Sequence, residues 1–160
     1  MSETTEAAAS EIIKLLRTSN HTLAVAESIT GGMLGGAITS VAGSSDVFIG
    51  GIVAYNVRIK SELLAVAPEL IAAHGVVSRE VAIAMAVGVQ RRLGSDWAIA
   101  TTGVAGPGPS GGVAAGTVWI AIAGPEGATA EPLVLPGNRE AVRMAAIDRA
   151  LGAFTRILRR

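Results

Sequence analysis

Residues 26–32, with the sequence AESITGG, place a serine where it suits nucleophilic catalysis. Ser28 follows a short apolar run over 23–26, which predicts a strand, and it precedes a run over 33–41 that predicts a helix opened by glycines. A strand, a sharp turn and a helix present a serine at the carboxyl edge of a sheet, beside the positive end of a helix dipole. That position suits an attacking hydroxyl or a bound anion.

The glycines after this serine strengthen the interpretation. Glycine lets the backbone approach a substrate closely, and two adjacent N–H groups there can hold an oxyanion while Ser28 attacks a carbonyl. The alternative is that Ser28 and Thr30 only cap the helix. A serine before glycine is too common a pattern to decide between the two.

Residues 55–60, YNVRIK, supply a candidate base. Of the 13 basic residues only Lys14 and Lys60 are lysines, and a desolvated amine can give up its proton whereas a guanidinium cannot. Tyr55, the only tyrosine, stands at the end of a predicted strand and close before Lys60, so that hydroxyl and amine can converge on one pocket. An aromatic plug and a solvated helix lysine would give the same spacing.

Residues 101–112, TTGVAGPGPSGG, form a loop with many N–H groups and small side chains, which suits a phosphate or a ribose. A long hairpin connection is the alternative. The loop lacks the Gly-Lys-Ser/Thr of an ATPase and the GxGxxG spacing of a dinucleotide site, so neither class is supported. Arg139 and Arg143, four residues apart on the last predicted helix, can reach an anion or form a solvated face.

The hydrophobic periodicity predicts the elements that must position these segments. The predicted helices cover 6–18, 33–41, 57–73 in two pieces divided at Pro68, the segment between Ser78 and Gly94, and a last helix capped by Asn138. The predicted strands cover 23–26, 48–55, 97–102, 117–123 and 129–135, with Pro132 favouring an edge position for the last. Helices between and after apolar strands predict an α/β fold over residues 1–160: a single-domain three-layer α/β/α sandwich with a mixed, partly parallel sheet.

Composition and net charge limit the classes of function that are expected for this chain. The chain of 160 residues is 50% hydrophobic, enough for a core, and its 13 basic and 13 acidic residues cancel, which disfavours direct contact with nucleic acid. No cysteine is present, and His21 and His74 are far apart, so no metal site is expected. The N-terminus is polar and acidic, and the long uncharged run at 97–125 is broken by glycines and prolines, so we expect a cytoplasmic protein without a membrane contact.

These segments, with VAGSS at 41–45, HGVVS at 74–78 and GTVWIAIAGPEG at 116–127, resemble in order and distance the C-terminal domain of the competence/damage-inducible protein CinA, the nicotinamide-nucleotide amidohydrolase family. The resemblance covers about residues 8–155. It implies a metal-independent amidohydrolase, without a cofactor, that converts nicotinamide mononucleotide and water to nicotinate mononucleotide and ammonia in pyridine nucleotide salvage. It also implies a homo-oligomer, most simply a dimer, and a domain that occurs alone or fused behind a nucleotide-processing domain, for which this length leaves no room.

The resemblance also implies roles for individual residues. Ser28 becomes the nucleophile, Lys60 the base, kept neutral by burial or by nearby Arg58, and Tyr55 a group that relays or orients the proton. The amides of Thr30, Gly31 and Gly32 become the oxyanion site. Ribose and phosphate are expected on Gly43, Ser44, Ser45, Thr102, Gly103, Gly106, Pro107 and Gly108.

The chain departs from the family pattern within the expected wall of the pocket. Ile29 replaces the usual Cys, residues 56–58 are Asn-Val-Arg where Ser-Asn-Glu is usual, and Ala114 and Ala115 replace a frequent Lys-Pro pair. An alternative is therefore a nucleotide-binding or regulatory protein that has lost turnover. A third hypothesis, an interaction protein in competence or DNA repair, is disfavoured by the neutral charge and the 3% aromatic content.

Overall fold

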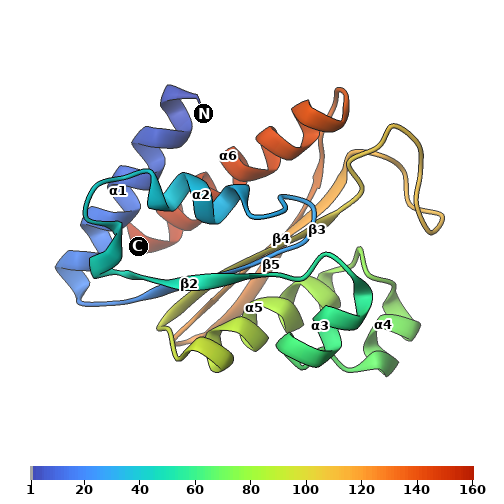
Figure 1. Cartoon of the computed structure of the whole chain (residues 1–160), viewed down its shortest axis with the longest axis horizontal. Coiled ribbons are helices and arrows are strands. Elements are labelled where there is room, and N and C mark those ends of the chain that lie inside the picture. The colour runs from blue at the N-terminus through green and yellow to red at the C-terminus, as the bar shows by residue number, and fades with distance from the viewer. Residues whose placement is uncertain (1) are drawn as a thin grey trace.

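The sheet at the centre of the molecule has five strands in the order β2-β1-β3-β4-β5. The computed structural model describes residues 2–160 (Figure 1). The strands are β1 (Leu23–Glu27), β2 (Phe48–Val53), β3 (Trp97–Gly103), β4 (Thr117–Gly124) and β5 (Gly127–Val134). β1 runs parallel to β2 and β3, whereas β4 is antiparallel to β3 and β5. The mixed sheet and the edge position of Pro132, which lies in β5, are as predicted.

Two layers of helices cover the sheet, which confirms the three-layer sandwich (Figure 1). One face carries α1 (Glu3–Ser19), α2 (Met33–Thr39) and α6 (Arg139–Leu158). The other carries α3 (Val57–Leu64), α4 (Pro68–His74) and α5 (Arg79–Leu93). A short 3-10 turn, η1 (Ser44–Asp46), precedes β2. No helix within residues 2–160 is long and apolar enough to cross a membrane.

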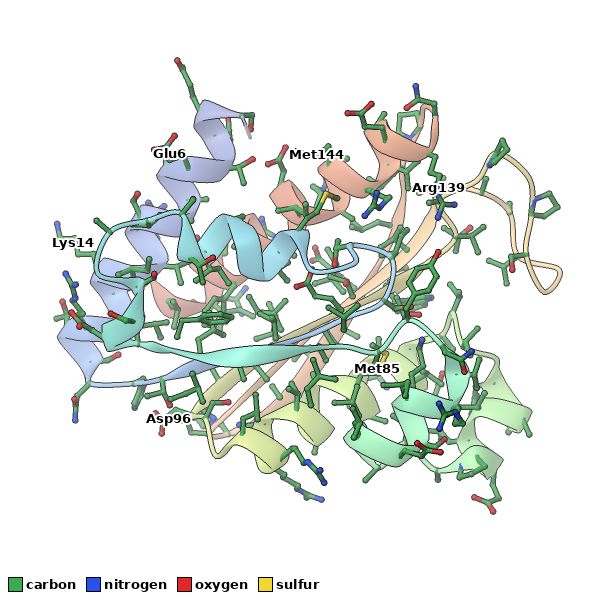
Figure 2. The ribbon with its side chains drawn as sticks, viewed as in Figure 1. Glu6, Lys14, Met85, Asp96, Arg139 and Met144 are labelled. Carbon is green, nitrogen blue, oxygen red and sulfur yellow. The ribbon has the colours of Figure 1, made fainter. Side chains whose placement is uncertain are left out.

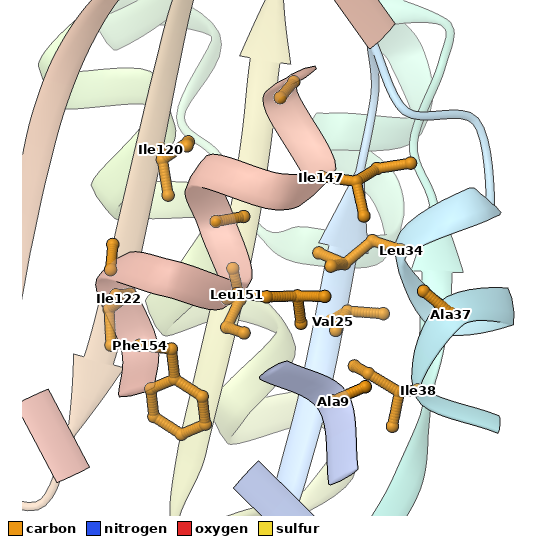
Figure 3. Packing of buried hydrophobic residues seen from close by; sticks show 14 of the residues in the cluster. Ala9, Val25, Leu34, Ala37, Ile38, Ile120, Ile122, Ile147, Leu151 and Phe154 are labelled. Atoms are coloured by element: carbon orange, nitrogen blue, oxygen red, sulfur yellow. The ribbon is translucent and has the colours of Figure 1, made fainter. Parts of the chain in front are cut away.

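The larger core lies between the sheet and the layer that contains α6 (Figure 3). Ile147, Leu151 and Phe154, at helical spacing on α6, are at most 1% exposed. They belong to the same buried cluster as Val25 of β1 and Ile120 of β4. Burying a side chain of this size contributes about 1.5–3 kcal/mol, so this layer fixes the sheet whose carboxyl edge carries Ser28.

α2 begins at Met33, as the sequence predicts, but it ends at Thr39 and is capped differently. Its N-cap is Gly32, with φ of 97°, and not Thr30, and no side chain at the cap itself bonds the first turn. The carboxylate of Glu27, at the end of β1, accepts hydrogen bonds from the N–H groups of Gly32, Leu34 and Gly35 at 2.8–3.2 Å. A carboxylate from the preceding strand therefore satisfies the donors that a local cap would serve.

Two helical glycines, Gly88 and Gly36, differ in how closely the neighbouring backbone packs against them. A Cβ at Gly88 of α5 would lie 2.0 Å from the Leu64 carbonyl oxygen, whereas a Cβ at Gly36 of α2 would meet nothing within 4 Å. We expect Gly88→Ala to lower the free energy of unfolding by about 1–3 kcal/mol, because backbone must move. Gly36→Ala should raise it by about 0.5–1 kcal/mol through helix propensity. Urea denaturation measures both; equal effects of the two substitutions would contradict the packing described here.

Candidate active site

Ser28 and Lys60 meet at the carboxyl edge of the sheet. The Lys60 Nζ lies 3.0 Å from the Ser28 Oγ and donates a second hydrogen bond to the Ala54 carbonyl at 2.7 Å. Ser28 is 8% exposed and Lys60 only 2%. A neutral amine in this place keeps an N–H for the carbonyl and a lone pair for the serine hydroxyl, which is the arrangement that a Ser–Lys dyad requires.

Burial lowers the pKa of the Lys60 amine and so favours its neutral form. Desolvation lowers the pKa of Lys60 from 10.5 to about 8. Arg58, which the sequence offered as another cause, has a largely exposed side chain paired with Glu62 at 3.0 Å. Burial is therefore the cause on which the neutral form depends.

The local sequence explains how Lys60 comes to point inward. The Asn56 side chain accepts a hydrogen bond from the Arg58 N–H and starts α3 at Val57. Lys60 follows on the buried side of this helix, together with Leu64. The Ala54 N–H donates to the Glu27 carbonyl at 2.7 Å, which ties the end of β2 to the end of β1 and holds α3 beside Ser28.

A cavity of about 710 Å³ opens over the two side chains. Its walls come from the turn after β1, the start of α3, the α4–α5 connection, the β3–β4 loop and the start of α6. Five of the predicted ribose and phosphate residues line it, namely Thr102, Gly103, Gly106, Pro107 and Gly108. The carboxyl ends of parallel strands are where open α/β sheets bind ligands.

Tyr55 lies at the rim of this cavity and is 63% exposed. Figure 2 labels Arg139, at the first position of α6. Its guanidinium donates to the Tyr55 hydroxyl at 3.1 Å and to the Gly106 carbonyl at 2.8 Å. Within residues 2–160 the Tyr55 hydroxyl makes no hydrogen bond to Ser28 or Lys60. Its proton-relay role therefore stays a prediction, whereas its contact with Arg139 is observed.

The turn after Ser28 does not offer the amides that the sequence suggested. The Gly31 N–H donates to the Ser28 carbonyl and the Gly32 N–H to Glu27. Thr30 is fully buried, and its hydroxyl bonds that of Thr101. None of these three residues lines the cavity. The expectation of an oxyanion site over residues 30–32 is corrected, because the N–H groups of both glycines already have acceptors.

The second correction concerns residues 43–45. Gly43, Ser44 and Ser45 precede β2 and therefore lie at the amino end of the parallel strands, opposite Ser28. The Gly43 carbonyl accepts a hydrogen bond from Arg17 of α1 at 3.0 Å. These residues do not line the cavity. The structure assigns them to a link between α1 and the α2–β2 connection, and not to ribose or phosphate.

The comparison with known proteins fits this geometry. The profile of the CinA C-terminal domain family matches residues 5–158. The chain belongs to the CinA C-terminal domain family. It is 48% identical over 160 residues to a CinA-like protein of Parasynechococcus marenigrum, and this match covers 97% of this chain and 38% of the relative. It is 55% identical over 120 residues to a CinA-like protein of Synechococcus sp., and this match covers 74% of this chain and 29% of the relative. The chain thus spans about a third of the length of these curated relatives.

Solved structures of the CinA superfamily share the whole fold. The competence/damage inducible protein CihA from Agrobacterium tumefaciens superimposes with a TM-score of 0.94 at 32% identity, covering 100% of this chain and 98% of that one. The competence damage-inducible protein A from Klebsiella pneumoniae gives 0.94 at 32% identity, covering 96% of each chain. The family resemblance inferred from the motifs is confirmed.

In this CinA-family chain the departures from the usual motif fall on two kinds of position. Ile29 and Val57 line the cavity. Asn56 caps α3 and Arg58 pairs with Glu62, so their side chains serve the helix. The altered motif therefore changes the wall of the cavity while leaving Ser28 and Lys60 in contact.

Sequence reasoning missed Glu27 and His74 and left the role of Arg139 open. Glu27 is 2% exposed and fixes the start of α2, and His74 lines the cavity beside Glu80 at 3.5 Å. The signal available for Glu27 was its position directly after a predicted buried strand, since carboxylates are rarely buried without hydrogen-bond donors. His74 opens the HGVVS segment that helped to carry the family resemblance, but the sequence assigned it no role in the site.

The buried amine gives the stability of this CinA-family chain a defined pH dependence. Between pH values of about 8 and 10.5 the unfolded chain binds more protons at Lys60 than the folded chain does, so the free energy of unfolding rises with pH in that window. Lys60→Met lacks this proton. We expect the unfolding free energy of the wild type, relative to Lys60→Met, to increase between about pH 7 and about pH 10 in urea denaturation, with exposed Lys14→Met as the control. A difference that stays constant over this range would contradict the burial of a titrating amine.

Proposed function

We propose that this chain hydrolyses the carboxamide of nicotinamide mononucleotide to nicotinate mononucleotide and ammonia, with Ser28 as nucleophile and Lys60 as base. The observation that carries the proposal is the 3.0 Å contact between the Ser28 Oγ and a buried amine of lowered pKa. This pair stands at one side of a cavity whose volume suits a small molecule. Membership of the CinA family supports the pyridine nucleotide as substrate.

The reaction then proceeds in two halves. The Ser28 Oγ attacks the carboxamide carbon, its proton passes to the Lys60 Nζ, and the electron pair of the C=O bond moves to the oxygen. When the carbonyl re-forms, the C–N bond breaks and Lys60 returns the proton to the leaving nitrogen, which departs as ammonia. Lys60 then takes a proton from water, whose oxygen attacks the carbonyl carbon of the resulting ester. When the carbonyl re-forms, the bond to the Ser28 Oγ breaks and Lys60 returns the proton to that oxygen, which releases the carboxylic acid and restores both side chains.

The cavity offers groups that suit the rest of the nucleotide. The end of β3 places the buried Thr102 at one side of the cavity, the loop between β3 and β4 adds glycine backbone, and the Arg139 guanidinium supplies positive charge at the rim. A phosphate is a suitable partner for such a guanidinium. Ile29 and Val57 supply apolar wall, which suits a pyridine ring.

The alternative, a nucleotide-binding protein without turnover, rested on the changed residues 56–58. Two of these three side chains are engaged with α3 itself and do not line the cavity. The contact between Ser28 and Lys60 is intact. The geometry therefore favours turnover over binding alone.

The activity is tested directly by ammonia release from nicotinamide mononucleotide by the purified chain. We expect release by the wild type and none above background by Ser28→Ala. Because the neutral amine is the base, log(kcat/KM) should rise with pH and level off above about 8. Binding of the nucleotide by calorimetry without ammonia release would select the alternative, and absence of both would exclude this substrate.

The role of Lys60 is tested by removing the amine while keeping the length of the side chain. We expect Lys60→Met to lower kcat by at least about 100-fold with a small effect on nucleotide binding, since general-base catalysis typically contributes this much. Lys60→Arg should fail to restore turnover, because a guanidinium stays protonated. A loss of tenfold or less in Lys60→Met would exclude the lysine as the base.

A further inference from the structure

A second charged side chain, Arg143 of α6, holds the turn that follows Ser28. Its Nε donates to the Ile29 carbonyl at 3.0 Å and its Nη2 to the Thr30 carbonyl at 3.4 Å. The Gly31 N–H closes the same turn by donating to the Ser28 carbonyl at 3.1 Å. The carbonyls of Ser28, Ile29 and Thr30 thus all accept hydrogen bonds from donors of the chain itself.

The hydrogen bonds to these carbonyls set the directions of the N–H groups in the same peptides. Arg143 holds the Thr30 carbonyl, which belongs to the same peptide as the Gly31 N–H, and the Gly31 N–H holds the Ser28 carbonyl, which belongs to the same peptide as the Ile29 N–H. In a trans peptide the N–H points opposite to the C=O of the preceding residue. The Ile29 N–H therefore points away from the interior of the turn, and within residues 2–160 it has no acceptor. Ile29 also lines the cavity, whereas Thr30, whose N–H likewise has no acceptor among these residues, does not.

The glycine at position 31 is required by the same arrangement. Gly31 has φ of 56°, and a Cβ there would lie 3.0 Å from the Arg143 Nη2. A side chain would be strained by the backbone angle and would press on the guanidinium. Glycine is the residue that lets Arg143 reach both carbonyls.

We propose that Arg143 is a positioning residue that orients the turn after Ser28, so that the Ile29 backbone N–H stabilises the oxyanion formed when Ser28 is acylated. The proposal rests on the proposed function for its reaction but not for its substrate. An N–H of the residue after the nucleophile is a familiar oxyanion donor in serine hydrolases, and removing one such donor costs about 100- to 1000-fold in rate.

The test uses a fluorophosphonate that modifies Ser28 without needing a pyridine nucleotide. Attack by the Ser28 Oγ forms the P–O bond, fluoride leaves, the serine proton goes to Lys60, and negative charge gathers on the phosphoryl oxygen during the step. We expect Arg143→Lys, whose single nitrogen cannot serve both carbonyls, to lower the rate constant of labelling, followed by mass spectrometry, by tenfold or more. Its pH midpoint should stay near that of the wild type, because Lys60 is untouched.

The matched control is Arg156→Lys on the same helix, where Arg156 pairs with Glu131 at the surface. It should be labelled at the wild-type rate. A second variant removes only the donor: an ester in place of the amide N–H of Ile29, introduced as the hydroxy-acid analogue of isoleucine, should be labelled about 100-fold more slowly. This variant decides the question if Arg143→Lys fails to fold.

Each outcome bears on the proposal. Labelling of the ester variant within threefold of wild type overturns it, as does a folded Arg143→Lys labelled within threefold or with a shifted pH midpoint. Absence of any Ser28 labelling in the wild type overturns it together with the acyl-transfer mechanism. If the wild type and the variants are labelled at the expected relative rates but the wild type releases no ammonia from nicotinamide mononucleotide, the proposal is supported and only the proposed substrate is rejected.

Discussion

The structure depends most on the costly placement of the Lys60 amine, which has almost no access to water and lies next to a hydroxyl and a carbonyl. Among residues 2–160 this amine has no carboxylate partner. An amine that pairs with a carboxylate stays charged, whereas one held only by neutral oxygens loses much of its preference for the proton. With the pKa of Lys60 at about 8, about a tenth of the molecules hold a neutral amine at pH 7, which is about 300 times the fraction expected at a pKa of 10.5. The fold therefore accepts a less stable lysine, and the proposed mechanism uses the neutral amine that results as its base.

Two charged side chains near the site, Glu27 and Arg143, act on the backbone and not on each other. Glu27 accepts the N–H groups at the start of α2, and Arg143 donates to the carbonyls of the turn just before it. A carboxylate satisfies the donors and a guanidinium satisfies the acceptors of one short segment, so the segment has little freedom to move. In a chain with only 16% charged residues, two of these charges are committed to the few residues that follow Ser28.

The sequence predicted those features that local patterns carry. Apolar periodicity identified the layers, and Pro132 identified the edge strand. The scarcity of lysine drew attention to Lys14 and Lys60, of which the structure brings Lys60 to Ser28. It could not predict the cap of α2, because the acceptor comes from Glu27, before the turn, where a rule for local caps does not look. The sequence analysis placed residues 43–45 at the site because a motif gives the order of segments along the chain. That order does not determine at which edge of the sheet a loop lies.

The same distinction explains what the unusual residues of this chain can change. Positions 56 and 58 follow Tyr55 directly, yet their side chains cap or brace α3, so residue types there are free to vary as long as the helix starts at Val57. Ile29 is different, because it lines the cavity and its Cδ1 would lie 3.0 Å from a Cβ at position 103. A side chain larger than the usual cysteine fits there because position 103 is a glycine, and its bulk adds an apolar wall beside Ser28. For the proposed activity, the substrate preference of this chain is therefore expected to depend on positions 29 and 57, which line the cavity, and not on positions 56 and 58.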